Sequence, residues 1–253
     1  MLETGENKSI PQIDSNYGFR NVVLNLDFED LENHLNVRSF KVSKREAIES
    51  LACLTFKLKD ELVNYDTVLI DDASGRLVGL YLLEQIKIKK TEEGKSRKVM
   101  AYGVASGNNV FSGQEDAVRK FIRDKKDSFG RVLVVTEHIR HGNGIMPLAE
   151  SLAREGVDFG IATVSAEDTF IDSNNSRYSD ERWKWLKDKV VYGNKGKGGL
   201  FFYHALESGM MKIQPSKNKF LAHAQKNPAT DQSVINETRR DMGYLARNIL
   251  EVM

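Results

Sequence analysis

Apolar and polar residues alternate along the chain in two different periods, which predicts an alternation of helices and strands. Between residues 43 and 62, apolar side chains recur every three or four positions, as on one face of an amphipathic helix. Ser43 and Glu46 have the spacing of a capping box, which predicts that this helix begins directly after Ser43. Short apolar runs predict strands at 67–70, 99–104, 132–135 and 159–164.

The residues between these strands predict helices. The ranges 76–86 and 117–126 have a helical pattern, and another helix is expected to end near Gly156. The range 132–135 is the strongest strand prediction, because four apolar residues follow one another and three of them are β-branched. Strands with intervening helices are typical of a parallel sheet covered on both faces. We therefore expect an α/β fold, a three-layer parallel sheet, with one or two additional C-terminal helices from Asn218 onward.

The alternation weakens after about Ser165, and this divides the chain into three parts. Residues 41–164 form the expected α/β core. Residues 1–40 are an N-terminal extension that contributes to a hood, and residues 165–253 are a C-terminal hood and helical extension. We expect both additions to lie over the edge of the sheet that binds a ligand.

Composition and charge narrow the classes of function. The 253 residues are 40% hydrophobic, which is enough to build a core. Lys and Arg total 37 against 36 for Asp and Glu, so the net charge of +1 provides no general attraction for nucleic acid. Cys53 is the only cysteine, which excludes an intramolecular disulfide and fits a reducing compartment. With no apolar run of about 18 residues and no signal-peptide core, we expect a cytoplasmic protein with no membrane partner.

The segment VLVVTEHIRHGNGI, residues 132–145, combines features that suit a sugar phosphate. An apolar strand is expected to end at Val135, an acid follows at Glu137, and the residues up to Gly144 are expected to open a helix. In parallel sheets, ligands bind beyond the carboxyl ends of strands, where backbone N–H groups point outward. A carboxylate there accepts hydrogen bonds from vicinal ribose hydroxyls, while a glycine loop surrounds a phosphate with N–H donors. Arg140 and His141 add positive charge for the same phosphate.

This segment resembles the ribose-phosphate motif of type I phosphoribosyltransferases. In that family an apolar strand is followed by two acids, two variable positions and a loop of the Thr-Thr-Gly-x-Thr type. The resemblance places the ribose- and phosphate-binding residues at Thr136, Glu137, Arg140, His141, Gly142, Asn143 and Gly144. Gly142 falls on the family glycine. The chain departs from the pattern where Thr136 replaces the first acid and where Arg140, His141 and Gly144 replace hydroxyl-bearing residues.

A second segment lies where the family places its pyrophosphate-binding turn, after an earlier strand. Asp71 and Asp72 offer carboxylates to Mg²⁺. Ser74, Gly75 and Arg76 offer a tight turn and a cation that pairs with phosphate oxygens. The order and separation of the two segments agree with the family, and the resemblance covers roughly half of the chain. The mobile catalytic loop of the family lies between them, where the segments 89–98 and 106–114 are both candidates.

The resemblance implies a type I phosphoribosyltransferase-like fold and a Mg²⁺-dependent reaction. The 5-phosphoribosyl group would move from phosphoribosyl pyrophosphate to a nitrogen nucleophile, or be released from a nucleotide. Glu137, Asp71 and Asp72 would be catalytic, and the two aspartates would hold the metal. An inactive nucleotide- or phosphoribosyl pyrophosphate-binding module is the alternative, because Thr136 removes one carboxylate. The third hypothesis is an interaction protein with no small-molecule ligand. The sequence also leaves open whether the chain forms a homodimer or binds another protein partner.

Other residues that invite a functional interpretation favour structural roles. The glycine-rich segment 193–199 lacks the spacing of a P-loop, so we expect a flexible hairpin or surface loop. Trp183 and Trp185 are expected to pack, with base stacking as the weaker alternative. The histidines lack paired metal-ligand spacing, so we expect no zinc site. Arg239 and its neighbour Arg240 are expected on a solvated helix face, with nucleic-acid binding as a minor alternative.

Overall fold

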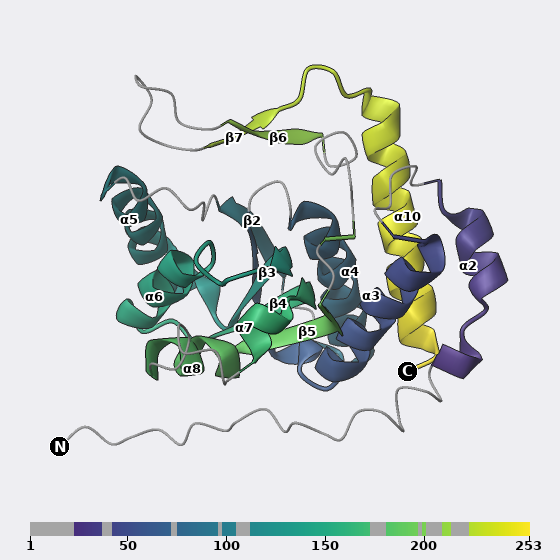
Figure 1. The fold of residues 1–253 in the computed structure, drawn as a ribbon, viewed down its shortest axis with the longest axis horizontal. Coiled ribbons are helices and arrows are strands. Elements are labelled where there is room, and N and C mark those ends of the chain that lie inside the picture. Colours follow the sequence, from purple (N-terminus) through teal and green to yellow (C-terminus); the bar gives the residue numbers. More distant parts are fainter. Residues whose placement is uncertain are drawn as a thin grey trace.

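A five-stranded sheet forms the centre of the protein (Figure 1). The computed structural model describes residues 23–36, 42–71, 75–95, 98–104, 112–172, 181–196, 199–200, 209–213 and 223–253. The strands are β1 (Thr67–Asp71), β2 (Met100–Val104), β3 (Val132–Ile139), β4 (Phe159–Ala166) and β5 (Val190–Lys195). They are all parallel and lie in the order β2-β1-β3-β4-β5. The predicted α/β fold with a parallel sheet is confirmed.

Helices cover both faces of this sheet (Figure 1). One hydrophobic core joins the sheet to α3 (Lys44–Leu58), α4 (Arg76–Glu92) and α10 (Gln232–Glu251). The other core joins it to α5 (Ser112–Phe129), α6 (Met146–Arg154) and α8 (Glu181–Asp188). Successive strand residues enter opposite cores, so that Val135 faces the first and Val134 the second. The other described elements are α2 (Phe28–His34), the 3-10 helix η1 (Leu62–Asn64), α7 (Asp168–Ile171) and the antiparallel hairpin of β6 (Met210–Ile213) and β7 (His223–Lys226).

The helix that precedes β1 begins where its capping residues predict. The side chain of Ser43 accepts a hydrogen bond from the backbone N–H of Glu46 at 3.1 Å. The apolar face of this helix is buried, since Ile48, Leu51 and Leu54 are each 0% exposed. A cap and an apolar stripe together therefore define α3, as the sequence predicts.

Two helices are longer than predicted. Helix α4 continues to Glu92, past the predicted end near Ile86, so the charged segment 89–98 is partly helical. Lys90 lies on the buried side of this extension because its Nζ pairs with Asp66 Oδ1 at 2.9 Å. Helix α5 begins at Ser112, inside the segment 106–114, of which residues 106–111 lie outside the described ranges. Each candidate for the mobile loop is thus a helix over part of its length.

The sheet extends beyond the expected core range of 41–164. Its edge strand β5 comes from the expected C-terminal hood, and Gly193, expected in a flexible hairpin or surface loop, lies within this strand. A Cβ at Gly193 would come within 2.2 Å of the backbone oxygen of Ser50, so this glycine allows α3 to pack closely. The helical prediction from Asn218 onward is wrong for 223–226, which form strand β7, and correct for α10.

The described N-terminal segment packs against the C-terminal helix (Figure 1). The ring of His34 stacks on Tyr244 with centroids 4.7 Å apart, and the Tyr244 hydroxyl donates to the Asp30 carboxylate. The backbone N–H of Asn36 donates to Asp241 Oδ2 at 2.7 Å. These contacts join α2 to α10, so the two ends of the described chain belong to one packed unit.

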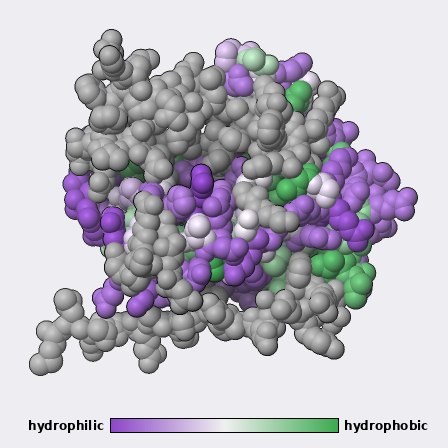
Figure 2. Space-filling model, viewed as in Figure 1, coloured by the Kyte–Doolittle hydropathy of each residue, from purple (hydrophilic) through white to green (hydrophobic). Residues whose placement is uncertain are grey.

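The described surface on the face shown in Figure 2 is mainly hydrophilic. Among the described residues, Leu24 is the large hydrophobic side chain that is strongly exposed, at 80%. None of the described helices is long and apolar enough to cross a membrane.

The strand order brings the ends of β1 and β3 together at the centre of the sheet. From β1 the chain passes through α4 to β2 on one side, and then through α5 to β3 on the other side of β1. A reversal of this kind opens a crevice at the carboxyl ends of the two central strands, where ligands commonly bind. The segments singled out in the sequence are the ones that leave β1 and β3.

Candidate functional site

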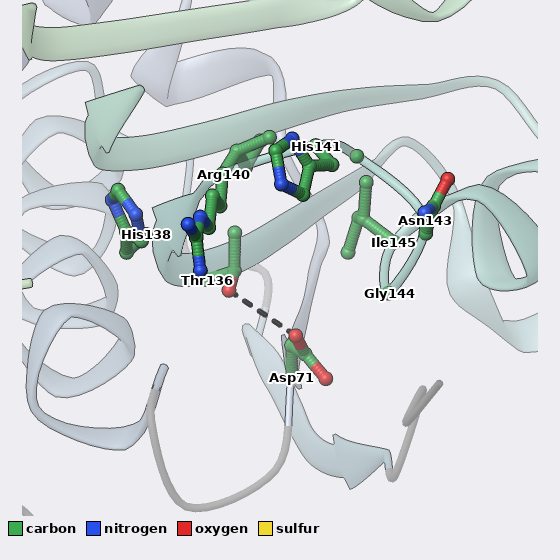
Figure 3. Close-up of a pocket in the computed structure, with 10 residues that line it drawn as sticks. Asp71, Thr136, His138, Arg140, His141, Asn143, Gly144 and Ile145 are labelled. Carbon is green, nitrogen blue, oxygen red and sulfur yellow. Dashed lines mark hydrogen bonds between the residues drawn. The ribbon is translucent and has the colours of Figure 1, made fainter. Parts of the chain in front are cut away.

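A pocket of about 310 Å³ lies at the carboxyl ends of β1 and β3 (Figure 3). One lining residue comes from β1, and the others come from the end of β3 and the loop that leads to α6. The described lining residues are Asp71, Thr136, His138, Ile139, Arg140, His141, Gly142, Asn143, Gly144 and Ile145. This volume is within the range of pockets that bind small molecules.

Most of the predicted site residues that the structure describes meet in this pocket. Asp71, from the predicted pyrophosphate turn, lies with Thr136 and the range 140–144 from the predicted ribose-phosphate segment. Asp72 and Ser74 lie outside the described residues. Gly75, Arg76 and Glu137 are described and are not among the lining residues.

Strand β3 continues to Ile139, beyond its predicted end at Val135. Thr136, Glu137 and His138 therefore belong to the strand, and successive side chains point to opposite faces. Thr136 and His138 line the pocket. The carboxylate of Glu137 lies elsewhere: it is 3% exposed, and a Cβ at Gly199 would come within 2.5 Å of its Oε1.

Asp71 and Thr136 form a hydrogen-bonded pair inside the pocket (Figure 3). The Thr136 hydroxyl donates to Asp71 Oδ2 at 3.1 Å. Ile70 pairs with Val135 in the register of the two strands, so the next residue of each strand stands on the same face. Asp71 is half-buried and Thr136 is 3% exposed. A buried neutral hydroxyl thus orients the carboxylate of the pocket.

The loop between β3 and α6 contains two glycines in different environments. Gly142 has a φ of +74°, and a Cβ there would come within 2.8 Å of Phe170 and 2.9 Å of Trp183. Its carbonyl accepts a hydrogen bond from the Met146 N–H at 3.0 Å, which begins α6. Gly144 has an ordinary φ, and a Cβ there would have no neighbour within 4 Å among the described residues. Packing therefore explains Gly142, whereas Gly144 faces open space in the pocket.

Both tryptophans of α8 pack into the protein, as expected. Trp183 packs against the core on the α6 side and lies next to Gly142 of the loop. Trp185 makes an edge contact with Phe159, with ring centroids 6.1 Å apart. Trp183 therefore packs directly beside the pocket loop.

Glu167, directly after β4, holds two side chains of the pocket. Its Oε1 is 3.2 Å from His138 Nε2, and its Oε2 is 3.5 Å from Arg140 Nε. Thr169 donates from its hydroxyl to the backbone carbonyl of Arg140 at 3.1 Å. The sequence analysis missed Glu167, because only the pairing of β3 with β4 brings it beside residues that are far away in the chain. The signal in the sequence that could have indicated Glu167 is its position just after a predicted strand.

Gly75 and Arg76 form the start of α4 beside the ends of β1 and β3. A Cβ at Gly75 would come within 2.5 Å of the Val135 carbonyl oxygen, so the turn needs glycine to pack against β3. Arg76 is half-buried, and burial lowers its pKa, with a further lowering from the charge of Arg239 in α10. A guanidinium remains charged at physiological pH despite such a shift. The start of α4 therefore carries positive charge next to a second cation.

The pocket residues suit a metal that arrives with a phosphate ligand. Among the described residues, no group of three or more His, Cys, Asp or Glu side chains could hold a metal by itself. Mg²⁺ commonly binds through one or two carboxylates together with substrate phosphates and waters. Asp71 provides such a carboxylate in the pocket.

The pocket combines chemical groups that suit an anionic molecule with hydroxyl groups. Asp71 accepts hydrogen bonds, Arg140 and the loop backbone attract anions, and Gly144 leaves room for close approach. No family model matches the chain, and no curated protein matches it either.

Proposed function

We propose that this is a Mg²⁺-dependent phosphoribosyltransferase-like protein that binds phosphoribosyl pyrophosphate or a nucleotide at the ends of β1 and β3. The observation that carries the proposal is that Asp71 and the loop from Arg140 to Gly144 line one pocket. The resemblance assigns these two segments to the two ends of one ligand, and they are far apart in the sequence. A ligand that contacts both segments requires the ends of β1 and β3 to be adjacent, and they are.

The loop from Arg140 to Gly144 is proposed to bind the 5′-phosphate. The Arg140 side chain is 69% exposed at the pocket, and His141 lies beside it in the lining. Asn143 and Gly144 also line the pocket, and backbone N–H groups of such a loop can donate to an anion. The absence of a Cβ at Gly144 lets a phosphate reach this backbone.

The other end of the pocket is proposed to face the pyrophosphate. In the transfer, the bond from ribose C1 to a pyrophosphate oxygen breaks and pyrophosphate leaves with the electron pair. A nitrogen nucleophile bonds to C1 and loses a proton. Asp71 and Asp72 would hold Mg²⁺, which would supply charge neutralisation for the pyrophosphate when bound. The chain contributes positioning and electrostatic stabilisation, with Arg76 as a nearby cation.

An inactive binding module is the second candidate function. Two observations favour it: position 136 carries a threonine, and Glu137 lies buried against Gly199, outside the described lining. The pocket therefore presents one carboxylate, Asp71, among its described lining residues. A module of this kind would bind the same ligands without turnover.

Calorimetric titration with phosphoribosyl pyrophosphate and Mg²⁺ tests whether the pocket binds this class of ligand. We expect micromolar binding to the wild type and a loss of about tenfold or more in Arg140→Gln, because a charge-assisted hydrogen bond is removed. Arg119→Gln is a matched control, since Arg119 also pairs with a glutamate through Nε, at 3.2 Å, and lies away from the pocket. If the wild type binds neither phosphoribosyl pyrophosphate nor any nucleotide, both candidate functions fail.

Release of pyrophosphate separates the enzyme from the binding module. The wild type is incubated with phosphoribosyl pyrophosphate, Mg²⁺ and a panel of nitrogenous bases, and pyrophosphate is measured over time. Base-dependent release that is reduced in Arg140→Gln supports the transferase. Tight binding without release of pyrophosphate for any base supports the module.

A further inference from the structure

The acidic pair implied by the resemblance does not form in the pocket. Thr136 stands at the first acidic position and carries no charge. The second acid, Glu137, is 3% exposed and lies against Gly199, outside the described pocket lining. A sugar phosphate in this pocket therefore needs another group to accept hydrogen bonds from its ring hydroxyls.

Asp71 occupies the place of the missing carboxylate. It is the last residue of β1, it lines the pocket, and it stands beside Thr136 on the same face of the sheet. The Thr136 hydroxyl donates to its Oδ2 at 3.1 Å. Because Thr136 is 3% exposed, the hydroxyl that orients this carboxylate belongs to a buried residue.

The pocket geometry separates the carboxylate from the cationic loop. Figure 3 shows Asp71 below Thr136, and the loop that carries Arg140 and His141 above them. A ribose phosphate has the same division, with a dianion at C5 and two neighbouring hydroxyls on the opposite edge of the ring. An ionised carboxylate has about four acceptor positions, so it can bind two hydroxyls while Thr136 holds it.

We propose that Asp71, positioned by the hydroxyl of Thr136, binds the vicinal hydroxyls of ribose and so replaces the acid that position 136 lacks. This inference rests on the proposed function, because it requires a sugar phosphate on the loop from Arg140 to Gly144, and it replaces the metal-binding role that the resemblance gives to Asp71. It defines the ligand more narrowly, as a 5-phosphate of ribose with both hydroxyls present. In this arrangement Thr136 is a positioning residue, and Asp71 contacts the ligand.

Binding of three simple probes tests this role of Asp71. Ribose 5-phosphate, 2-deoxyribose 5-phosphate and inorganic phosphate are titrated calorimetrically in buffer that contains a chelator instead of Mg²⁺. We expect the wild type to bind ribose 5-phosphate about tenfold more tightly than the deoxy sugar, because the latter loses a hydrogen bond to a charged group. Asp71→Asn and Thr136→Val should bring this ratio close to one. Both variants should still bind inorganic phosphate, and Asp71→Asn should bind it no less tightly than the wild type, because a negative charge leaves the pocket.

Two further variants separate positioning from general damage. Thr136→Ser keeps the hydroxyl and should keep the preference for ribose. Thr163→Val is the matched control, because Thr163 pairs with Thr136 in β4, is 0% exposed and donates its hydroxyl to the Ser165 carbonyl at 3.0 Å. It should keep the preference as well. Urea unfolding shows which variants fold, and if Asp71→Asn does not fold, the comparison of Thr136→Val with Thr136→Ser and Thr163→Val decides.

Several outcomes contradict the role of Asp71. A preference for ribose that persists in Asp71→Asn overturns it, and so does a loss of preference in Thr163→Val. A preference that appears only when Mg²⁺ is added also overturns it, because Asp71 then acts as a metal ligand. Equal binding of the two sugars by the wild type overturns this inference alone. Failure of the wild type to bind any of the three probes also overturns this inference, whereas the proposed function fails only if phosphoribosyl pyrophosphate with Mg²⁺ and nucleotides do not bind either.

Discussion

Gly142 and Gly144 are two residues apart in one loop, and different physical causes act on them. At Gly142 the backbone has a φ of +74°, and Phe170 and Trp183 fill the space that a Cβ would need. At Gly144 the backbone is ordinary, and no described residue occupies the space that a Cβ would enter. Substitution by alanine therefore separates a glycine needed for folding from a glycine available for binding.

We predict that Gly142→Ala lowers the free energy of unfolding by roughly 2 kcal/mol or more, because it combines a left-handed alanine with overpacking. Gly144→Ala should change it by less than about 0.5 kcal/mol, as surface substitutions usually do. Urea unfolding at constant m-value measures both. The same Gly144→Ala protein should bind phosphoribosyl pyrophosphate more weakly, because its Cβ enters the pocket. Equal loss of stability in the two variants would contradict this division.

Tyr65 gives the protein a specific sensitivity to alkaline pH. Burial raises the pKa of its phenol to about 12, and the nearby Arg131 opposes this in part. In the unfolded chain the phenol loses its proton near pH 10. The stabilisation is therefore complete below pH 10 and is lost as the pH rises through about 12, where the folded state also ionises.

We predict that the wild type loses about 3 kcal/mol more of its free energy of unfolding between pH 10 and 12 than Tyr65→Phe does. Urea unfolding at a series of pH values measures the two slopes. Tyr81, whose pKa is also raised by burial, is present in both proteins and cancels in the comparison. Parallel slopes for the two proteins would show that Tyr65 does not control alkaline unfolding.

At the scale of elements, apolar runs predict the apolar parts of the strands and miss their polar ends, even where these ends are buried. The range 132–135 is predicted as a strand, whereas residues 136–138 of β3 are all polar where the strand meets the pocket. Strand β5 is missed because Tyr192, Gly193 and Asn194 interrupt its apolar pattern at the edge of the sheet. The hydrophobic pattern thus predicts the ends of these strands poorly, although one of these ends lines the site.

The sequence did not predict which strands lie side by side, and the contacts of the site depend on this pairing. The two pocket segments and most lining residues were predicted from local chemistry together with the resemblance to the phosphoribosyltransferase family. The bond from Thr136 to Asp71 depends on β1 lying beside β3, and the contact from Glu167 to His138 depends on β4 lying on the other side. Alternation along β3 likewise directs Glu137 away from the pocket, which no spacing in the sequence reveals until the strand boundary is known.

A buried polar network holds three helices together. Thr55 of α3 is hydrogen bonded to Tyr81 at 2.6 Å and to Gln85 Oε1 at 3.0 Å, both in α4. Gln85 Nε2 donates to the Ala246 carbonyl of α10 at 3.3 Å. All of these side chains are 0% exposed, so a lost partner leaves a buried polar group without water.

We predict that Gln85→Leu lowers the free energy of unfolding by about 1–3 kcal/mol, because Thr55 and the Ala246 carbonyl each lose a hydrogen bond in a dry environment. Thr91→Val is the control, since Thr91 also donates to a backbone carbonyl of α4 and is exposed to water. Its effect should stay within about 0.5 kcal/mol. Urea unfolding measures both changes, and similar values for the two variants would contradict a role for burial.

At the scale of the molecule, the C-terminal helix is a structural part of the α/β domain. Met242, Leu245, Ala246 and Ile249 are each 0% exposed and belong to the same core as the strands and α3. The N-terminal segment closes over this helix through Asn36 and Asp241. Residues 232–251, expected as part of a hood and helical extension, thus complete one face of the fold.

This arrangement predicts that a destabilising substitution in α10 lowers the stability of the whole protein. Leu245→Ala should lower the free energy of unfolding by about 2–5 kcal/mol, as buried leucines do, with a single transition seen by circular dichroism and tryptophan fluorescence. Both tryptophans lie in α8, across the sheet from α10, so their fluorescence reports the opposite face. Arg247→Ala, which removes an exposed pair with Glu84, should cost less than about 0.5 kcal/mol. A separate early transition in circular dichroism, with tryptophan fluorescence unchanged, would contradict this prediction. It would show that α10 unfolds independently while the face of the sheet covered by α8 stays folded.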